Sequence, residues 1–389
     1  MDSWLERAAA LRPDRVAVEA PDGSVTYAEL LDRAGAAARG LHGVVPIDLP
    51  PGLDLVVRLH ACLLAGAVAM PIDQRLGARE RAPLLAARDP GPGAALIVHT
   101  SGTTGAPEPV HIALENILAN ALGSAVALGL YPAERWLCPL PLSHVGGLMV
   151  LLRSAIYATT AVIGPPDRDD VTLVSLVPTM LARLLDADAR PGPRLRAVLL
   201  GGAAADRGLL ARARDAGWPV APTYGLTQAC SQVTVGEVGD VETSGRPLPG
   251  VSVALAPDGE ILVTGPTVAG GGTLRTGDLG RLDDRGRLIV AGRKADTIVS
   301  GGENVAPAEV EAVLRAHPAV ADAGVFARPH PEWGEAVTAR VVLRGVASER
   351  ELREWAGQRL AGFKVPKAIE VAEALPRTES GKLLRRELA

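Results

Sequence analysis

The chain has 389 residues, a hydrophobic fraction of 48%, a charged fraction of 22% and a net charge of -4. This length allows two or three substantial cores, and the composition excludes a disordered chain. The slightly acidic balance gives no electrostatic basis for nucleic-acid binding, which needs a concentrated basic surface. Cys62, Cys138 and Cys230 match no disulfide or zinc spacing, and the charged residues near the start do not fit a secretory signal peptide, so we expect a cytoplasmic protein.

The first part of the chain alternates strand-like and helical stretches. Ala17–Glu19 and Val25–Tyr27 flank the turn signal Asp22-Gly23, which predicts a hairpin. Helical spacing occurs at residues 27–41, 55–64, 179–185 and 206–216. Further strands are expected at residues 67–71, 94–99, 161–163, 172–176, 197–200 and 220–222. Strands that alternate with helices predict a layered α/β domain with largely parallel sheets.

The most membrane-like stretch runs from Val145 to Pro166 and contains Arg153. A membrane-spanning helix needs about 20 apolar residues with few or no charges. We therefore expect no membrane span, and we interpret this stretch as buried core that holds one charge for a reason.

The pattern changes twice in the second half of the chain. From about Val233, short strands separated by Asp/Gly turns predict a small antiparallel barrel. After Gly292, Pro307 stands at a first helical position, and the strands and helix that follow predict an α+β module of about 95 residues. The strands are expected at 251–255, 260–264, 287–290, 320–327 and 336–343, and the last helix at 348–360.

The predicted fold class is therefore α/β, with a large N-terminal layered domain, a small β-barrel subdomain and a small α+β C-terminal domain joined by a hinge. We place the N-terminal domain at residues 1–293, with its barrel-like part at about 233–293. The hinge is expected at 294–296 and the mobile C-terminal domain at 297–389.

A run of hydroxyl and glycine residues follows the strand expected near residue 98. Such a run lets the backbone turn tightly and lets N–H groups and hydroxyls surround phosphate oxygens. It lacks the spacing of a Walker loop, so we interpret it as a different nucleotide cradle, with a polar surface loop as the alternative. The residues expected to hold phosphate are Thr100, Ser101, Gly102, Thr103, Thr104 and Gly105.

With this loop the chain resembles the adenylate-forming superfamily of acyl-CoA synthetases, peptide-synthetase adenylation domains and luciferases. The resemblance covers nearly the whole chain, although the chain is shorter than most members and the missing length falls mainly in the first lobe. Each motif is a weak pattern alone, but their common order is specific. The motifs are the loop at 99–107, Gly201-Gly202-Ala203-Ala204, Tyr224-Gly225-Leu226-Thr227-Gln228, Thr276-Gly277-Asp278 with Gly292-Arg293, and residues 376–382.

The resemblance implies a role in nucleotide binding for several of these residues. The loop Gly201-Gly202-Ala203 faces adenine. Tyr224, which precedes Gly225, stacks on the adenine ring. Thr227 reaches the phosphate, and Asp278 and Arg293 bind the ribose hydroxyls. Taken alone, Thr-Gly-Asp is ordinary turn chemistry, so the assignment of Asp278 rests on the ordered series.

The resemblance also implies a mobile C-terminal domain. Lys382 drives adenylation, a role that suits a compact charge on a flexible stem, although a solvated tail lysine is the alternative. Ala295 is the pivot of the hinge. Gly301 and Gly302 line the pantetheine tunnel for coenzyme A, and Trp333 lines the same tunnel or packs in the core.

Two residues depart from the pattern of the superfamily. Glu108 stands where a lysine usually follows the phosphate loop, and Gln228 stands where a glutamate helps to hold Mg²⁺. An amide offers an oxygen without a charge, so Gln228 is a weaker candidate metal ligand than a carboxylate. A nucleotide-binding homologue with impaired adenylation is therefore one alternative.

Three residues are candidates for binding the acid. In the superfamily, a histidine or an aromatic residue at the position of His144 borders the acyl pocket. A lone histidine on an apolar segment is more often a core residue, so the sequence favours neither alternative for His144. Arg153 needs a carboxylate partner from the protein or from a substrate, because a buried guanidinium is costly unless paired. The surrounding sequence looks most like the ortho-succinylbenzoate–CoA ligases of menaquinone biosynthesis, in which Arg153 and Ser175 meet the carboxylate or ketone of the substrate.

The predicted function is an ATP-dependent acid–CoA ligase that acts through an acyl-adenylate. We expect 2-succinylbenzoate, ATP and coenzyme A to give 2-succinylbenzoyl-CoA, AMP and diphosphate, with Mg²⁺ as the metal cofactor. His144, Thr227 and Lys382 are the expected catalytic residues. Another small acyl- or aryl-CoA ligase is the second alternative, and the sequence does not specify an oligomeric state.

Overall fold

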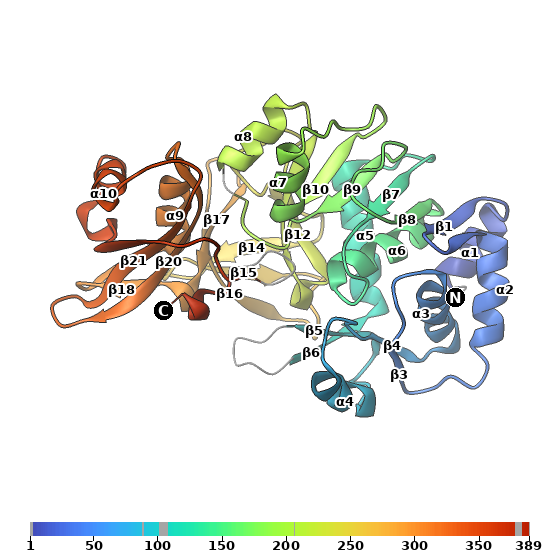
Figure 1. The fold of residues 1–389 in the computed structure, drawn as a ribbon. Coiled ribbons are helices and arrows are strands. Elements are labelled where there is room, and N and C mark those ends of the chain that lie inside the picture. Colours follow the sequence, from blue (N-terminus) through green and yellow to red (C-terminus); the bar gives the residue numbers. More distant parts are fainter. Residues whose placement is uncertain (1–2, 88, 101–107, 206, 378–382, 389) are drawn as a thin grey trace.

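The computed structural model describes residues 3–87, 89–100, 108–205, 207–377 and 383–388, and its strands form four sheets (Figure 1). The largest sheet consists of β1 (Val16–Ala20), β2 (Gly23–Thr26), β7 (Arg135–Cys138), β8 (Thr160–Ile163), β9 (Leu173–Leu176), β10 (Ala197–Leu200), β11 (Val220–Leu226), β12 (Ser231–Val235) and β13 (Arg246–Pro247). Their order is β13-β12-β11-β10-β9-β7-β8-β1-β2. Neighbours from β11 to β1 are parallel, and β2, β12 and β13 are antiparallel additions. The predicted hairpin and the largely parallel α/β layer are confirmed.

Helices cover both faces of this sheet. One face carries α5 (Leu114–Leu128) and α6 (Val145–Tyr157), and the other carries α7 (Pro178–Asp186) and α8 (Arg207–Asp215). Successive strand residues point to opposite faces. Trp136 therefore belongs to the core with α6, whereas Leu137 belongs to the core with α7 and α8. By the same alternation Ser175, between Val174 and Leu176 of the second core, points toward α6.

A smaller sheet builds the first lobe, at the lower right of Figure 1. Its order is β3 (Val44–Ile47), β4 (Val68–Pro71), β5 (Ala94–Thr100) and β6 (Glu108–Ala113), with β5 and β6 antiparallel. The helices that precede or connect these strands are α1 (Trp4–Leu11), α2 (Tyr27–Ala37), α3 (Leu53–Ala65) and α4 (Ala78–Ala86).

Capping residues fix several helix starts. Ser3 and Thr26 each accept a bond from the backbone of a glutamate three residues later, and that glutamate bonds back to the cap. Ser348 does the same for α10 (Glu349–Gly357). This reciprocal arrangement satisfies two helix-terminal N–H groups, which explains why α10 begins after Ser348 rather than at it.

The third and fourth sheets occupy the second half of the chain. The third is an antiparallel row of β14 (Ser252–Leu255), β15 (Glu260–Thr264), β16 (Thr273–Leu282) and β17 (Leu288–Arg293). The fourth has the order β19 (Glu303–Val305), β18 (Ile298–Ser300), β21 (Gly334–Leu343) and β20 (Val320–His330), with β22 (Ala368–Val371) on β21. Helix α9 (Pro307–Arg315) begins at the predicted proline, and short 3-10 turns lie at Thr227–Ala229, Lys294–Asp296, Gly362–Lys364 and Arg385–Glu387. The long strand β16 has no counterpart among the sequence predictions.

The stretch Val145–Pro166 forms α6 and β8, and most of its side chains are buried. Among the described residues, no helix combines the length and the apolar character needed to cross a membrane. The interpretation of this stretch as core with one buried charge is confirmed by Arg153, which is 2% exposed.

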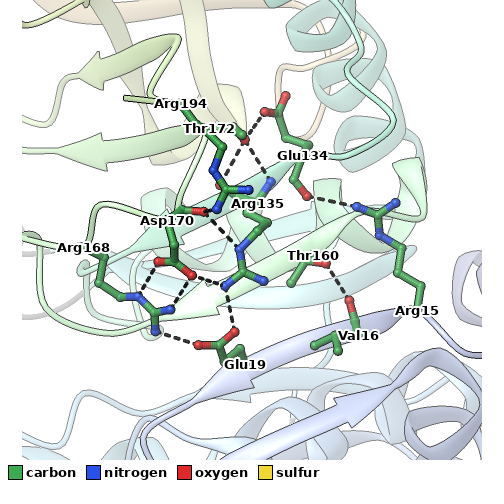
Figure 2. Close-up of polar contacts among 10 residues, drawn as sticks. All are labelled: Arg15, Val16, Glu19, Glu134, Arg135, Thr160, Arg168, Asp170, Thr172 and Arg194. Carbon is green, nitrogen blue, oxygen red and sulfur yellow. Dashed lines mark hydrogen bonds and ion pairs between the residues drawn. The ribbon is translucent and has the colours of Figure 1, made fainter. Parts of the chain in front are cut away.

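An ionic network joins the amino ends of the parallel strands. Figure 2 shows Arg135 at the start of β7 between two carboxylates, at 2.8 Å from Glu19 and 2.6 Å from Asp170. Asp170 also forms an ion pair with Arg168, with 2.7 Å between Arg168 Nη2 and Asp170 Oδ2. Each charge in this network therefore has an opposite charge beside it, although the sequence analysis assigned these residues no role.

Candidate active site

The loop that follows β10 lies beside β11, because these strands are parallel neighbours in register from Val198 with Val220 onward. A Cβ atom on Gly201 would lie 2.5 Å from the Oγ1 atom of Thr223, and Gly202 has a φ of +79°. Side chains at these two positions would clash or be strained. The glycines therefore allow the Gly201–Ala203 backbone to lie at the carboxyl edge of the sheet, where open α/β sheets bind ligands.

Tyr224, Asp278 and Arg293 form one cluster. The Tyr224 hydroxyl donates to Asp278 Oδ2 at 2.7 Å, and Arg293 Nε lies 2.8 Å from Asp278 Oδ1. Asp278 on β16 and Arg293 on β17 are direct register partners. Burial is the main cause that raises the pKa of Tyr224, and the negative charge of Asp278 is the second. The phenol therefore stays protonated and donates a hydrogen bond. The structure thus brings together three residues that lie up to 69 positions apart, from Tyr224 to Arg293.

Glu260 holds the backbone next to this cluster in place, although the sequence indicated no role for it. Its side chain is 5% exposed, and its Oε1 accepts the Gly277 N–H at 3.1 Å. Its other oxygen pairs with Arg275 and, at 3.3 Å, with Lys294. Glu260 therefore fixes the turn that positions the next residue, Asp278.

A tight turn connects β11 to β12 and carries Thr227 and Gln228. Cys230 and Ser231 have positive φ angles of 53° and 91°, and both are non-glycine residues. A Cβ on Gly225 would lie 1.8 Å from the Ser231 carbonyl oxygen. Such strain persists only where the surrounding structure imposes it, and it is concentrated at functional sites. The strained turn holds Thr227 and Gln228 directly beyond Tyr224 and Gly225.

Arg153 lies inside the layer between α6 and the large sheet. Its Nη2 atom donates to the side-chain oxygen of Asn120, and its guanidinium lies 5.4 Å from the ring centroid of Trp136. The Trp136 indole N–H donates to Ser175 Oγ at 3.0 Å. Asn120 in turn donates to the Gln232 carbonyl at 2.8 Å. The predicted acid-binding residues Arg153 and Ser175 are thus linked through Trp136, and Asn120 links Arg153 to β12.

No carboxylate pairs with Arg153 among the residues that the structure describes, and its Nε atom is buried without a hydrogen-bond partner there. Burial lowers the pKa of Arg153, because removing the cation from water disfavours its charged form. Of the two alternatives for this arginine, pairing with a protein carboxylate does not occur in the described part of the chain.

His144 is the residue before α6 and is half-exposed. Its Nε2 atom lies 2.8 Å from Arg75 Nη2 and 3.3 Å from Asp73 Oδ2. Burial lowers the pKa of His144, and the charge of Asp73 acts in the opposite direction. The first lobe and the large sheet therefore meet at this histidine.

The remaining predicted residues lie elsewhere or outside the description. Thr100 ends β5 opposite Glu108, whose backbone oxygen accepts the Thr100 hydroxyl at 3.4 Å. Gly301 and Gly302 form the turn between β18 and β19, where Gly301 N–H donates to the Trp333 carbonyl at 2.8 Å. The predicted residues outside the described part of the chain are Ser101, Gly102, Thr103, Thr104, Gly105 and Lys382.

Sequence reasoning did not identify Asn120, Trp136, Glu260, Asp73 and Arg75. One of them carried a usable signal: Asn120 is a polar residue within the largely apolar stretch 117–122. A polar residue at a buried helical position must find a partner. The others are joined to the site only by contacts between distant segments.

The sequence profile of the family described as "AMP-binding enzyme" matches residues 5–91 and 86–271, and that of the "AMP-binding enzyme C-terminal domain" matches residues 309–382. The 2-succinylbenzoate–CoA ligase of Bacillus subtilis is 35% identical over 473 aligned residues, which cover 99% of this chain and 97% of that relative. The enzyme of the same name from Bacillus cereus is also 35% identical and covers 100% and 98%.

Solved structures give the same result. The o-succinylbenzoate CoA synthetase of Bacillus subtilis in complex with the acyl-adenylate intermediate OSB-AMP superposes with a TM-score of 0.91 at 33% identity, covering 100% of this chain and 98% of that one. ATP-bound MatB from Rhodopseudomonas palustris has a TM-score of 0.87 at 26% identity, with the same coverage. The two segments matched by the first profile meet at residues 86–91, which agrees with missing length in the first lobe.

Proposed function

The chain belongs to the family of AMP-binding enzymes, and from that premise we propose that it is an ATP-dependent 2-succinylbenzoate–CoA ligase. In the first half-reaction a substrate carboxylate oxygen attacks the α-phosphorus of ATP, and diphosphate leaves. In the second, the coenzyme A thiol attacks the acyl carbonyl, losing its proton, and AMP leaves. The products are 2-succinylbenzoyl-CoA, AMP and diphosphate.

Arg153 is the observation that supports this choice of acid. A guanidinium that is 2% exposed and has no carboxylate partner among the described residues costs free energy unless an anion pairs with it. Succinylbenzoate carries two carboxylates, so one pairs with Arg153 while the other is activated. A monoacid would leave the arginine unpaired when bound.

The nucleotide is assigned to the cluster of Tyr224, Asp278 and Arg293. We propose that adenine stacks on Tyr224 beside Gly201–Ala203, and that the ribose hydroxyls bond to Asp278. Arg293 orients that carboxylate through its 2.8 Å contact. Thr227 and Thr100, with residues 101–105, are assigned to the phosphates.

Mg²⁺ is expected to accompany ATP. Among the described residues, no group of three or more His, Cys, Asp or Glu side chains is arranged to hold a metal. This fits a metal bound mainly by phosphate oxygens and water, for which one protein oxygen suffices. Gln228 would supply that oxygen, and the ion would neutralise phosphate charge.

The hinge at 294–296 remains a proposal that two ion pairs support. Lys294 lies 2.6 Å from Asp258 in the turn between β14 and β15, whereas Asp296 lies 3.0 Å from Arg385 near the C-terminus. Ala295 stands between these two anchored residues, so rotation can concentrate there. In one orientation Lys382 would stabilise the attack on phosphorus, and in the other Gly301 and Gly302 would line the thiol's path.

Exchange of labelled pyrophosphate into ATP, with a panel of acids, tests the function. Exchange that requires succinylbenzoate supports the proposal. Exchange with other acids instead identifies another acyl- or aryl-CoA ligase. Retained AMP binding without exchange identifies an impaired homologue, an alternative that the exposed Glu108 and the neutral Gln228 favour.

The Lys382→Ala variant tests the division between half-reactions. We expect at least a hundredfold loss of acyl-adenylate formation, because charge stabilisation in the transition state is lost. Conversion of supplied acyl-adenylate to the thioester should continue. Persistence of both half-reactions would contradict the assignment.

The location is also part of this proposal. Cys62, Cys138 and Cys230 are buried and form no disulfide, which supports a reducing, cytoplasmic location.

A further inference from the structure

Asp73 and Arg75 follow β4 of the first lobe, yet they contact His144 at the start of α6 in the large sheet. Arg75 grips Asp73 through two side-chain bonds, Nε to Oδ1 at 2.8 Å and Nη2 to Oδ2 at 2.5 Å. The Arg75 backbone N–H adds a third bond to Asp73 Oδ1 at 3.0 Å. The guanidinium is thereby oriented before it reaches the histidine.

The contact between Arg75 and His144 determines where the imidazole can carry its proton. A guanidinium has donors and no acceptor. The 2.8 Å contact from Arg75 Nη2 to His144 Nε2 therefore requires Nε2 to accept, which leaves the single proton of a neutral ring on Nδ1. Two further features oppose a charged ring: the adjacent Arg75 cation and the amino end of α6, where His144 is the N-cap.

Asp73 favours the other arrangement. Its Oδ2 atom lies 3.3 Å from the same Nε2, so a proton there would be donated to the carboxylate. Arg75 prevents this by engaging both Asp73 oxygens and by occupying Nε2 itself. Among the described residues, Asp73 and Arg75 are the charged groups that contact the ring and act on its charge.

We propose that Asp73 and Arg75 are positioning residues for His144, holding its ring neutral with the proton on Nδ1 so that Nδ1–H donates to a carbonyl or carboxylate oxygen of the bound acid. This inference rests on the proposed function, because it places His144 at the acid. It assigns a specificity role to a loop of the first lobe.

Selective ¹⁵N-histidine labelling and NMR of the whole chain test the first part. In the wild type at pH 7, His144 should show a protonated Nδ1 and an unprotonated Nε2. In Arg75→Met the proton should move to Nε2, where Asp73 then accepts it. Arg81→Met is the matched control, because Arg81 pairs with Asp48 at 3.0 Å in the same lobe, and it should leave the signals unchanged.

Steady-state kinetics test the second part. Arg75→Met should raise the KM for the acid about tenfold, as expected for one lost hydrogen bond, with kcat and the KM for ATP unchanged. His144→Asn, which keeps a donor near Nδ1, should stay within about threefold of wild type, whereas His144→Gln should match Arg75→Met.

The proposal requires both results. A wild-type ring protonated on Nε2, or a tautomer or KM unaffected by Arg75→Met, overturns it while succinylbenzoate-dependent exchange still stands. Absence of exchange with every acid overturns the proposed function and this inference with it.

Discussion

Strand β7 begins with neighbouring residues, Arg135 and Trp136, that belong to two contrasting regions. Arg135 lies in the ionic network of Figure 2, between Glu19 and Asp170, with its side chain 21% exposed. Trp136 faces the other way and contacts Arg153, which is 2% exposed. Within the described part of the chain, Arg153 contacts an amide oxygen and a ring but no carboxylate. The more deeply buried arginine is the less compensated one.

We interpret this difference as one between a stabilising charge and the charge that we propose binds the acid. The desolvation cost of a charge rises with burial, so a purely structural arginine would gain most from a carboxylate at the position of Arg153. The chain supplies such partners at the amino ends of the strands and supplies none at Arg153 in the described residues. The pattern is expected where a ligand anion completes the site.

Glu134→Gln should give the largest effect, and it acts on stability. Glu134 is 3% exposed and pairs with Arg196, which also contacts it at 3.1 Å through Nε. Removing the charge leaves Arg196 without its carboxylate partner and should lower the free energy of unfolding by about 3 kcal/mol. Urea denaturation measures this. A loss below about 1 kcal/mol, or a changed KM for the acid, would contradict a purely stabilising role for the Glu134 charge.

Arg153→Met should give the opposite pattern. We expect the KM for succinylbenzoate to rise about a hundredfold, equivalent to about 3 kcal/mol, with little change in ATP binding or in unfolding free energy. Kinetics and denaturation on the same preparation check both. A destabilised variant with an unchanged KM would make Arg153 a structural residue and remove the contrast.

The network should also weaken in acid. A hydrogen bond from Arg168, the largest cause, and one from Arg135 lower the pKa of Asp170 from 3.8 to about 2. A lowered carboxyl pKa contributes stability that is complete above pH 3.8 and is lost as the pH falls through about 2. Because this carboxylate is one-third exposed, we expect a contribution of only about 1 kcal/mol. Unfolding of Asp170→Asn should lose this part of the pH dependence; an unchanged profile would contradict it.

Relief of backbone strain should give the smallest effect. Ser231 has a φ of 91° in the turn that carries Thr227. Ser231→Gly should remove strain and raise the unfolding free energy by up to about 1 kcal/mol, while the looser turn raises the KM for ATP a few-fold. Thermal unfolding and kinetics measure the two changes. A destabilised variant would show that the serine side chain, rather than strain, matters here.

Local patterns predicted the fold well. The hairpin at Asp22-Gly23, the proline at the start of α9 and the alternation of strands with helices depend on spacing within a few residues. Strand β16 was missed because glycines and charges in Thr273–Leu282 hide its alternation. Its pairing with β15 and β17 makes it a strand, and that pairing is not a local property.

The site was predicted less completely. Motif order identified Tyr224, Asp278 and Arg293 as candidates, and the structure joins them in one cluster. Glu260 and Arg75 act through contacts with distant segments, which no local pattern encodes. That none of the described residues places a carboxylate beside Arg153 likewise became visible only when its neighbours in three dimensions were known.

A crystal structure with a hydrolysis-resistant analogue of succinylbenzoyl-adenylate tests the central claim most directly. We predict that the free carboxylate of the acyl group lies within hydrogen-bond distance of the Arg153 guanidinium, with the ribose on Asp278. A carboxylate bound elsewhere, with Arg153 still held only by Asn120 and Trp136, would contradict the account.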